Sequence, residues 1–213
     1  MKLKIIAGLL VVSVMLSGLM VGCQAQPTVE EEITPAAKIE LMQVSVGEMT
    51  LSVPTSKTWE HMRGDFLSPM KAAAAEGMVV DGYNERWKDV FLHLGYLDMK
   101  QVAESQGISW QGWEAALEAE GKTKEQYTEE VSAAFLLDAD ELTRTGQAQL
   151  TIQGNEALEL QYTGLKHDEP AFIFAVAIFG ENDLGILVSL LDEEAWDKNK
   201  EIWYTIRDSA QLP

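Results

Sequence analysis

Residues 172–192 read FIFAVAIFGENDLGILVSLLD and contain two apolar segments, Phe172–Phe179 and Leu184–Leu191. Successive side chains of a strand point to opposite faces of its sheet, so a strand that is apolar throughout must be covered on both faces. The polar segment Gly180–Asp183 has the composition of a turn. This stretch therefore predicts two central strands, joined by a turn, with a packed layer on each side of the sheet.

The segment that follows predicts a final helix. Asp192 stands at the N-cap position, where a carboxylate accepts hydrogen bonds from backbone N–H groups of the first turn. Ala195, Ile202 and Ile206 recur along one side of that helix, with Trp203 beside them. A stripe of this kind predicts a helix that packs on the sheet.

The segment before the central strands predicts a hairpin with its turn at Gly154-Asn155. Apolar and polar residues alternate on both sides of that turn, which indicates one buried and one solvated face. The residues expected on the buried face are Leu150, Ile152, Leu158, Leu160 and Tyr162.

Earlier segments carry shorter signals. Residues 39–46 and 49–54 predict a hairpin around Gly47-Glu48, and Ser68-Pro69 predicts a helix start. Val90–Leu97 predicts a strand. Thr123 and Gln126 form a capping box that opens a helix through about Leu137.

Ser109 is expected to cap a further helix, which carries Trp110 and Trp113 and ends at Gly121. The two tryptophans could line a groove for a ligand or partner, because tryptophan dominates binding hot spots. Ala116 and Leu117 share their stripe, so we interpret the tryptophans as core residues that pack against the sheet.

Several of these segments together resemble PsbP-like domains. They are MTLSVPTSKTWE (49–60), ALELQYTG (157–164), the central stretch 172–192 and AWDKNKEIWYTIRDSAQL (195–212), and the resemblance covers about residues 48–60 and 148–213. It implies an α+β fold, an α/β/α sandwich around an antiparallel β-sheet flanked by helices. Members include small bacterial lipoproteins and accessory subunits that help to assemble larger complexes, so the resemblance implies binding or assembly.

The N-terminal residues predict where the protein is localised. Lys2 and Lys4 precede the uncharged apolar run Ile5–Val21, which has the form of a secretory signal or of a membrane-spanning helix. The end of the run, Leu19-Met20-Val21-Gly22-Cys23, resembles a bacterial lipobox, although Met20 stands where leucine is usual. The resemblance implies cleavage before Cys23 and attachment of palmitate-like acyl chains to it. The alternative is an uncleaved anchor helix with an incidental cysteine.

Three parts of the chain follow: a lipoprotein signal peptide at 1–22, a lipidated acidic and proline-containing tether at 23–37, and a single α+β domain at 38–213. We expect the protein on the extracytoplasmic face of the cell membrane, or in the outer membrane if the cell has one. Its partners would be the membrane, through the lipid on Cys23, and a protein of the cell envelope.

Composition excludes several functions. The formal net charge is −18, which opposes binding to a nucleic-acid backbone. The single cysteine excludes an internal disulfide and a multi-cysteine metal site. The sequence lacks the nucleophile-elbow, zinc-protease, dinucleotide and phosphate-loop motifs, so we expect neither a cofactor nor a catalytic residue.

Histidines and acidic clusters are the candidate metal ligands of the chain. His61, His93 and His167 lack the spacing of metal ligands, and His93 is expected on the solvated face of its strand. Oxygen-rich clusters could hold Ca²⁺, but none fits the calcium-loop pattern and each also suits a turn or a helix end. The clusters are Asp138/Asp140/Glu141, Asp168/Glu169 and Glu181/Asp183. The tripeptide Arg63-Gly64-Asp65 is interpreted as a chance match.

Two functional hypotheses follow. The first is a non-enzymatic, lipid-anchored binding or assembly module, which predicts an exposed apolar or aromatic patch away from the tether. The second is a cell-surface hydrolase or small-ligand receptor, which predicts a cleft where two carboxylates, or His93 or His167 with a carboxylate, meet.

Overall fold

The computed structural model describes residues 40–55, 59–85, 90–137, 139–166 and 168–213, all within the compact unit Lys38–Pro213. The predicted signal peptide, Cys23 and the tether lie outside the described residues. No helix in the described ranges is long and apolar enough to span a bilayer.

The strands are β1 (Leu41–Val46), β2 (Met49–Pro54), β3 (Trp59–His61), β4 (Val79–Glu85), β5 (Val90–Asp98), β6 (Ala139–Ile152), β7 (Asn155–Lys166), β8 (Glu169–Phe179) and β9 (Asp183–Asp192). The α-helices are α1 (Ser68–Ala73), α2 (Met99–Ser105), α3 (Trp113–Glu120), α4 (Lys124–Ala133) and α5 (Glu193–Asp208). A 3-10 turn, Gly64–Phe66, precedes α1.

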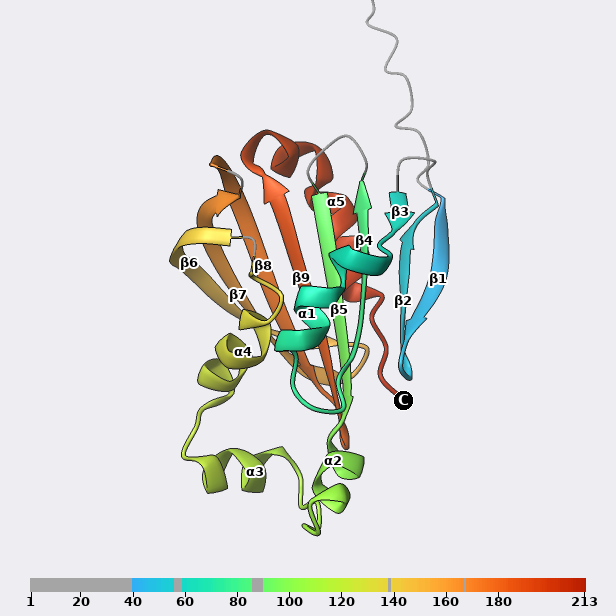
Figure 1. The fold of residues 1–213 in the computed structure, drawn as a ribbon, viewed down its shortest axis with the longest axis vertical. Helices are drawn as coiled ribbons and strands as arrows, with labels where there is room; N and C mark the ends of the chain where they lie inside the picture. The colour runs from blue at the N-terminus through green and yellow to red at the C-terminus, as the bar shows by residue number, and fades with distance from the viewer. Residues whose placement is uncertain (1–39, 56–58, 86–89, 138, 167) are drawn as a thin grey trace, which may run out of the picture. The chain divides into compact units, whose positions relative to one another are not determined.

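Seven strands form one antiparallel sheet in the order β3-β4-β5-β9-β8-β7-β6, so β9 lies at its centre (Figure 1). The two predicted central strands pair from Ala171 and Asp192 at one end to Phe179 and Leu184 at the other. Both strands are buried along most of their length. The prediction from residues 172–192 is thus confirmed.

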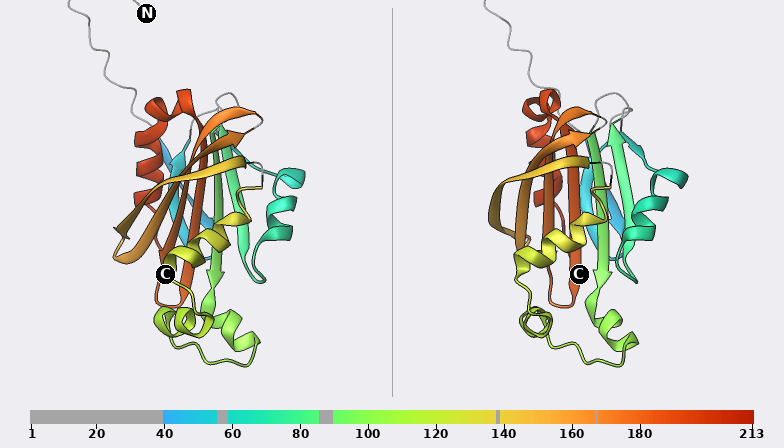
Figure 2. Two further views of the ribbon diagram at one scale, coloured as in Figure 1. Left: turned by 90° about the vertical axis from the view of Figure 1, so that its left-hand side faces the viewer. Right: turned by 60° about the vertical axis from the view of Figure 1, so that its left-hand side comes forward.

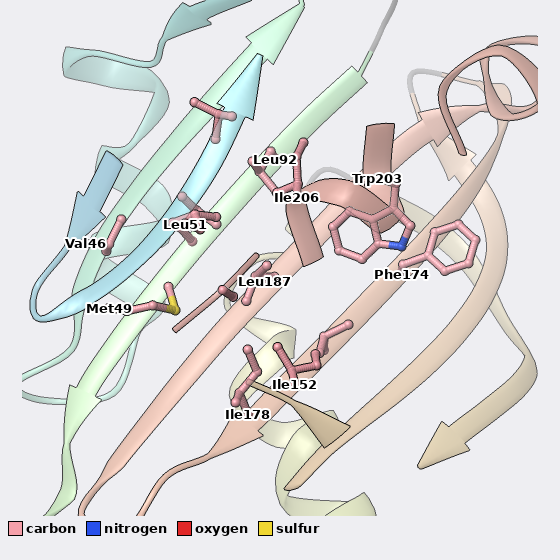
Figure 3. Close-up of a cluster of buried hydrophobic side chains, with 14 of the residues drawn as sticks. Val46, Met49, Leu51, Leu92, Ile152, Phe174, Ile178, Leu187, Trp203 and Ile206 are labelled. Carbon is pink, nitrogen blue, oxygen red and sulfur yellow. The ribbon is translucent and has the colours of Figure 1, made fainter. Parts of the chain in front are cut away.

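One face of the sheet is covered by α5 and by the separate β1–β2 hairpin (Figures 1 and 2). Gly47 has a φ of 57°, as the predicted turn requires. Figure 3 shows how Leu51 of β2 and Trp203 and Ile206 of α5 approach the sheet. Together with the sheet's own apolar residues, these side chains form one continuous core.

The opposite face is covered by α1, which contacts β4, and by α4, which contacts β7, β8 and β9. Phe135, just after α4, is 1% exposed and belongs to this second core. The chain is therefore an α/β/α sandwich, and both layers are needed because β8 and β9 are apolar on both faces.

The β6–β7 hairpin differs from its prediction. Its turn is Gln153-Gly154, with Ile152 paired to Asn155, and both turn residues have positive φ. A two-residue turn pairs even-numbered residues of one strand with odd-numbered residues of the other, so Ile152 shares a face with Asn155 and Ala157 and not with Leu158. Leu150 and Ile152 therefore lie on the α5 face, whereas Leu158 and Leu160 face the α4 layer.

This register places a charge in the core. Glu159, expected on a solvated face, is 2% exposed on the α5 side of the sheet. Its carboxylate accepts from Arg207 of α5 at 3.0 Å and from the Gln161 amide at 2.8 Å. The pair joins α5 to β7, and both charges gain a partner that replaces water.

Other local predictions had mixed outcomes. The capping box of Thr123 and Gln126 is present, and Gly121 ends α3 in the left-handed conformation. Ser109 does not cap α3, because the helix begins three residues after Trp110 with Gly112 at its N-cap. β3, β4 and α2 were not predicted, since their short segments contain glycine or few apolar residues.

Replacing Arg207 with Ala should lower the free energy of unfolding by about 3–5 kcal/mol, because Glu159 would remain buried without its cationic partner. Arg144→Ala is the matched control. It breaks ion pairs with the more exposed Glu125 and Glu129, and should cost about 1 kcal/mol or less. Urea unfolding measures both values, and equal losses would contradict the buried role of Arg207.

Candidate functional site

The candidate site is the end of the sheet that carries α2, α3 and the β8–β9 turn, which we call the helical end. The chain enters β1 at Leu41, paired with Pro54, whereas the turn of that hairpin lies at the other end, where Met49 is close to Gly185 beside the β8–β9 turn. α2 follows β5 at the same end as this turn, and Met99 N–H donates to Asn182 O at 2.8 Å. Figure 1 shows α2 and α3 beyond the sheet at the end opposite the start of β1.

Aromatic side chains fasten α3 to the sheet. The ring of Trp113 meets those of Trp110, Tyr127 and Phe179 edge to face, at centroid distances of 5.3, 5.5 and 4.9 Å. Edge-to-face contacts of this kind add to the stabilisation from buried area. Trp113 is 8% exposed, so its interpretation as a core residue is confirmed.

Both indoles also donate hydrogen bonds to the β8–β9 turn. Trp113 Nε1 donates to Gly180 O at 2.8 Å, and Trp110 Nε1 donates to Glu181 O at 3.1 Å. These carbonyls would otherwise require water, because the turn offers them no strand partner. The two tryptophans thus fix the α2–α3 connection to the β8–β9 turn.

The tip of this connection is apolar and exposed. Ile108 follows Gly107, which has a φ of 74°, and 58% of Ile108 is exposed. The Ile108 N–H donates to Ala103 O at 2.9 Å, which holds the tip against the end of α2. An exposed isoleucine on a backbone fixed in this way is available for contact with another molecule.

Acidic side chains are exposed on the two helices that the tip connects. Glu104 of α2 and Glu114 and Glu118 of α3 are exposed. Farther along, Lys122 forms ion pairs with Glu120 at 2.8 Å and with Glu130 at 2.5 Å, and these raise the pKa of Lys122. The helical end therefore combines an apolar tip with exposed acidic side chains on both adjoining helices.

A buried polar pair lies next to the β8–β9 turn, between β5 and the start of β9. Tyr96 Oη donates to Asp183 Oδ1 at 2.5 Å, and burial, followed by Asp183, raises the pKa of Tyr96. The Asp183 side chain is thus bound to a tyrosine inside the fold, while Glu181 is exposed. The pair has a structural role, and the cluster Glu181/Asp183 does not converge on a common point.

A histidine–carboxylate pair lies elsewhere, on β3 and β4. His61 Nε2 lies 2.6 Å from Asp81 Oδ1, and Asp81 also accepts from Gly82 N–H at 2.8 Å. The His61 ring packs on Tyr83 at 5.1 Å, and burial, followed by Asp81, raises the pKa of Tyr83. This pair had no local signal, because 20 positions of the chain separate its members. Its contacts hold the three-residue β3 against β4.

The remaining candidate residues are dispersed. His93 was expected to be solvated and is instead 3% exposed. Phe135, just after α4, packs on that face of β5, and His93 Nδ1 lies 3.0 Å from Phe135 O. His167 and Asp138 lie outside the described residues. Asp140, Glu141, Asp168 and Glu169 are exposed, as are Arg63, Gly64 and Asp65. Within the described ranges, no three histidine, cysteine or acidic side chains are grouped as metal ligands.

Comparisons with known proteins bear on the fold. No protein-family model and no curated protein sequence matches the chain. Among solved structures, the solution structure of cyanobacterial PsbP (CyanoP) from Synechocystis sp. PCC 6803 is similar, with a TM-score of 0.51 and 15% identity over 84% of this chain and 96% of that one. The fold is PsbP-like.

A second solved structure, LpqN from Mycobacterium tuberculosis, which is involved in cell envelope biogenesis, has a TM-score of 0.43. Its identity is 11%, over 83% of this chain and 92% of LpqN. The antiparallel sheet with a layer on each face is the α/β/α sandwich that the resemblance of residues 48–60 and 148–213 implied.

Stability at high pH should depend on Tyr127. Burial, followed by Glu120 and Glu130, raises the pKa of Tyr127 to about 12, from 10.0 in the unfolded chain. The folded state keeps its proton where the unfolded state loses it, so the free energy of unfolding should fall as pH rises from 10 towards 12. The free energy of unfolding of Tyr127→Phe, measured by urea unfolding at each pH, should fall less steeply over this range. The same dependence on pH in both proteins would contradict this assignment.

Proposed function

We propose that the protein is a lipid-anchored, extracytoplasmic binding or assembly module that holds a protein partner at its helical end. The observation that carries the proposal is the exposed Ile108. It lies two residues before Trp110, whose ring packs on the buried Trp113, at the end of the domain opposite the start of β1. Binding surfaces usually have an apolar centre that is fixed in position and a polar rim around it.

The anchor is supported by the sequence. Cys23 is the only cysteine, and it directly follows an apolar run and a glycine, as in a lipobox. Each buried CH₂ of an acyl chain contributes about 0.8 kcal/mol, so two or three chains would hold the protein in the bilayer essentially permanently. The acidic segment Glu30–Glu32 would keep the tether off anionic headgroups.

A binding role, rather than catalysis, is supported by what the polar side chains do. Asp183 accepts from the buried Tyr96, Asp81 joins β4 to His61 of β3, and Glu159 pairs with Arg207. Each of these carboxylates is engaged in joining two elements of the fold. The resemblance to PsbP-like domains, which include assembly accessory subunits, points in the same direction.

The acidic residues of the helical end indicate the charge of the partner's surface. Glu104 of α2 and Glu114 and Glu118 of α3 are exposed on the helices that flank the apolar tip in the chain, and the whole chain has a net charge of −18. A partner would therefore present lysine or arginine around an apolar pocket for Ile108. Charge attraction across such an interface speeds association and weakens as salt screens it.

The anchor is tested by growing cells with a clickable fatty acid and comparing the full chain with Cys23→Ala. The full chain should be labelled and should sediment with membranes, and the variant should lose all label because it has no other cysteine. Labelling of the variant at the wild-type level would refute attachment at Cys23.

The helical end is tested by placing a photo-crosslinking amino acid at Ile108 of the full chain in intact cells. It should capture one basic envelope protein, and Glu114→Lys/Glu118→Lys should reduce the yield by reversing the local charge. The control position is Leu41, which is also apolar and exposed but lies at the start of β1. Equal capture of the same protein from both positions would contradict a partner site at the helical end.

A further inference from the structure

The two edges of the sheet differ in length. β3 has three residues and offers little backbone for pairing, whereas β6 has 14 and forms the other edge (Figure 2). Within the described residues, the backbone of positions 146–152 bonds only across the hairpin to β7. The outer side of this segment is therefore a row of backbone donors and acceptors open to pairing.

The outer segment lacks the usual protections of an edge. Natural edge strands carry charges, prolines or bulges that prevent pairing. The β6 irregularities end before Gly146, and residues 146–152, GQAQLTI, have a regular register with neither charge nor proline. Seven neutral residues on an open edge stand out in a chain whose net charge is −18.

The hairpin turn determines which backbone groups point outward. Ile152 and Asn155 flank a two-residue turn, so their backbone groups face each other. Along an antiparallel strand these groups alternate in direction. The backbone N–H and C=O of Gln147, Gln149 and Thr151 therefore point away from β7.

We propose that this edge pairs with the same edge of a second copy of the chain, in an antiparallel register centred on Gln149. Gln149 then lies opposite its own copy and Gln147 lies opposite Thr151, so every outward donor meets an outward acceptor. Ala148 lies opposite Leu150, both half-buried on the α5 face. Apolar residues thus meet apolar ones, and polar residues meet polar ones, on each face of a continuous sheet.

The absence of charge on the segment favours a second copy as the occupant. Two strongly acidic bodies repel each other at most relative positions, but this register brings no pair of like charges into direct contact across the strands. The remaining repulsion acts between the bodies and is screened by salt. Pairing at β6 should therefore strengthen with salt, in contrast to a charge-steered contact at the helical end.

The register is tested by oxidising, in detergent, variants of the full chain that each add one cysteine to Cys23. Gln149→Cys should form a disulfide-linked dimer, because each new thiol lies opposite its copy. Gln147→Cys is the matched control: it has the same residue type on the same exposed face, but its copy lies about 13 Å along the strand. A mixture of Gln147→Cys and Thr151→Cys chains should cross-link.

The unsubstituted chain sets the background from Cys23, so the outcome does not depend on lipidation. Gln149→Cys dimers should form at least about tenfold faster than Gln147→Cys dimers and faster in high salt. Gln149→Asp should leave the chain monomeric by sedimentation, while Gln43→Asp on the exposed β1 should not change its association. Equal cross-linking of both cysteine variants, or cross-linking of Gln149→Cys to a different protein, would overturn the proposal.

Discussion

The structure depends on two strands that cannot face water on either side. Leu184–Leu191 of β9 and Phe172–Phe179 of β8 are apolar almost throughout, and together they form the centre of the sheet. The chain covers one face with α5 and the β1–β2 hairpin and the other with α1 and α4. These layers bring Trp203 and Phe135 onto opposite faces of the sheet. The rest of the fold follows from this double coverage.

Sequence reasoning succeeded where a signal was local and failed where partners were distant. The β8–β9 turn and the Thr123 capping box are encoded within a few residues. The β6–β7 turn was misplaced by one residue because Gly154 suits either position. A two-residue turn at either place puts Leu150 and Leu158 on opposite faces, so the shared buried face expected for them was wrong. His93 was expected in solvent because its strand alternates, although the second layer comes from a helix 30 to 40 positions away.

The candidate site was predictable in part. The tryptophan pair was found from its helical spacing, although Trp110 lies before α3 and both indoles bind a turn some 70 positions away. The exposure of Ile108 and the open edge of β6 depend on the tertiary fold and had no sequence signal. The proposed function and the further inference together give the protein three separate attachment points. These are lipid at Cys23, a partner at the helical end and a second copy along β6.

Native-state hydrogen exchange on the full chain tests the central constraint most directly. If β8 and β9 hold the two layers together, their amides should exchange only through global unfolding, with an opening free energy equal to that from urea unfolding. The amides of α2 and α3 should open more easily without exposing the β8–β9 ladder. The account would be contradicted if the amides of β8 and β9 exchanged through a partial unfolding of lower free energy, in which one layer detaches and the other stays packed.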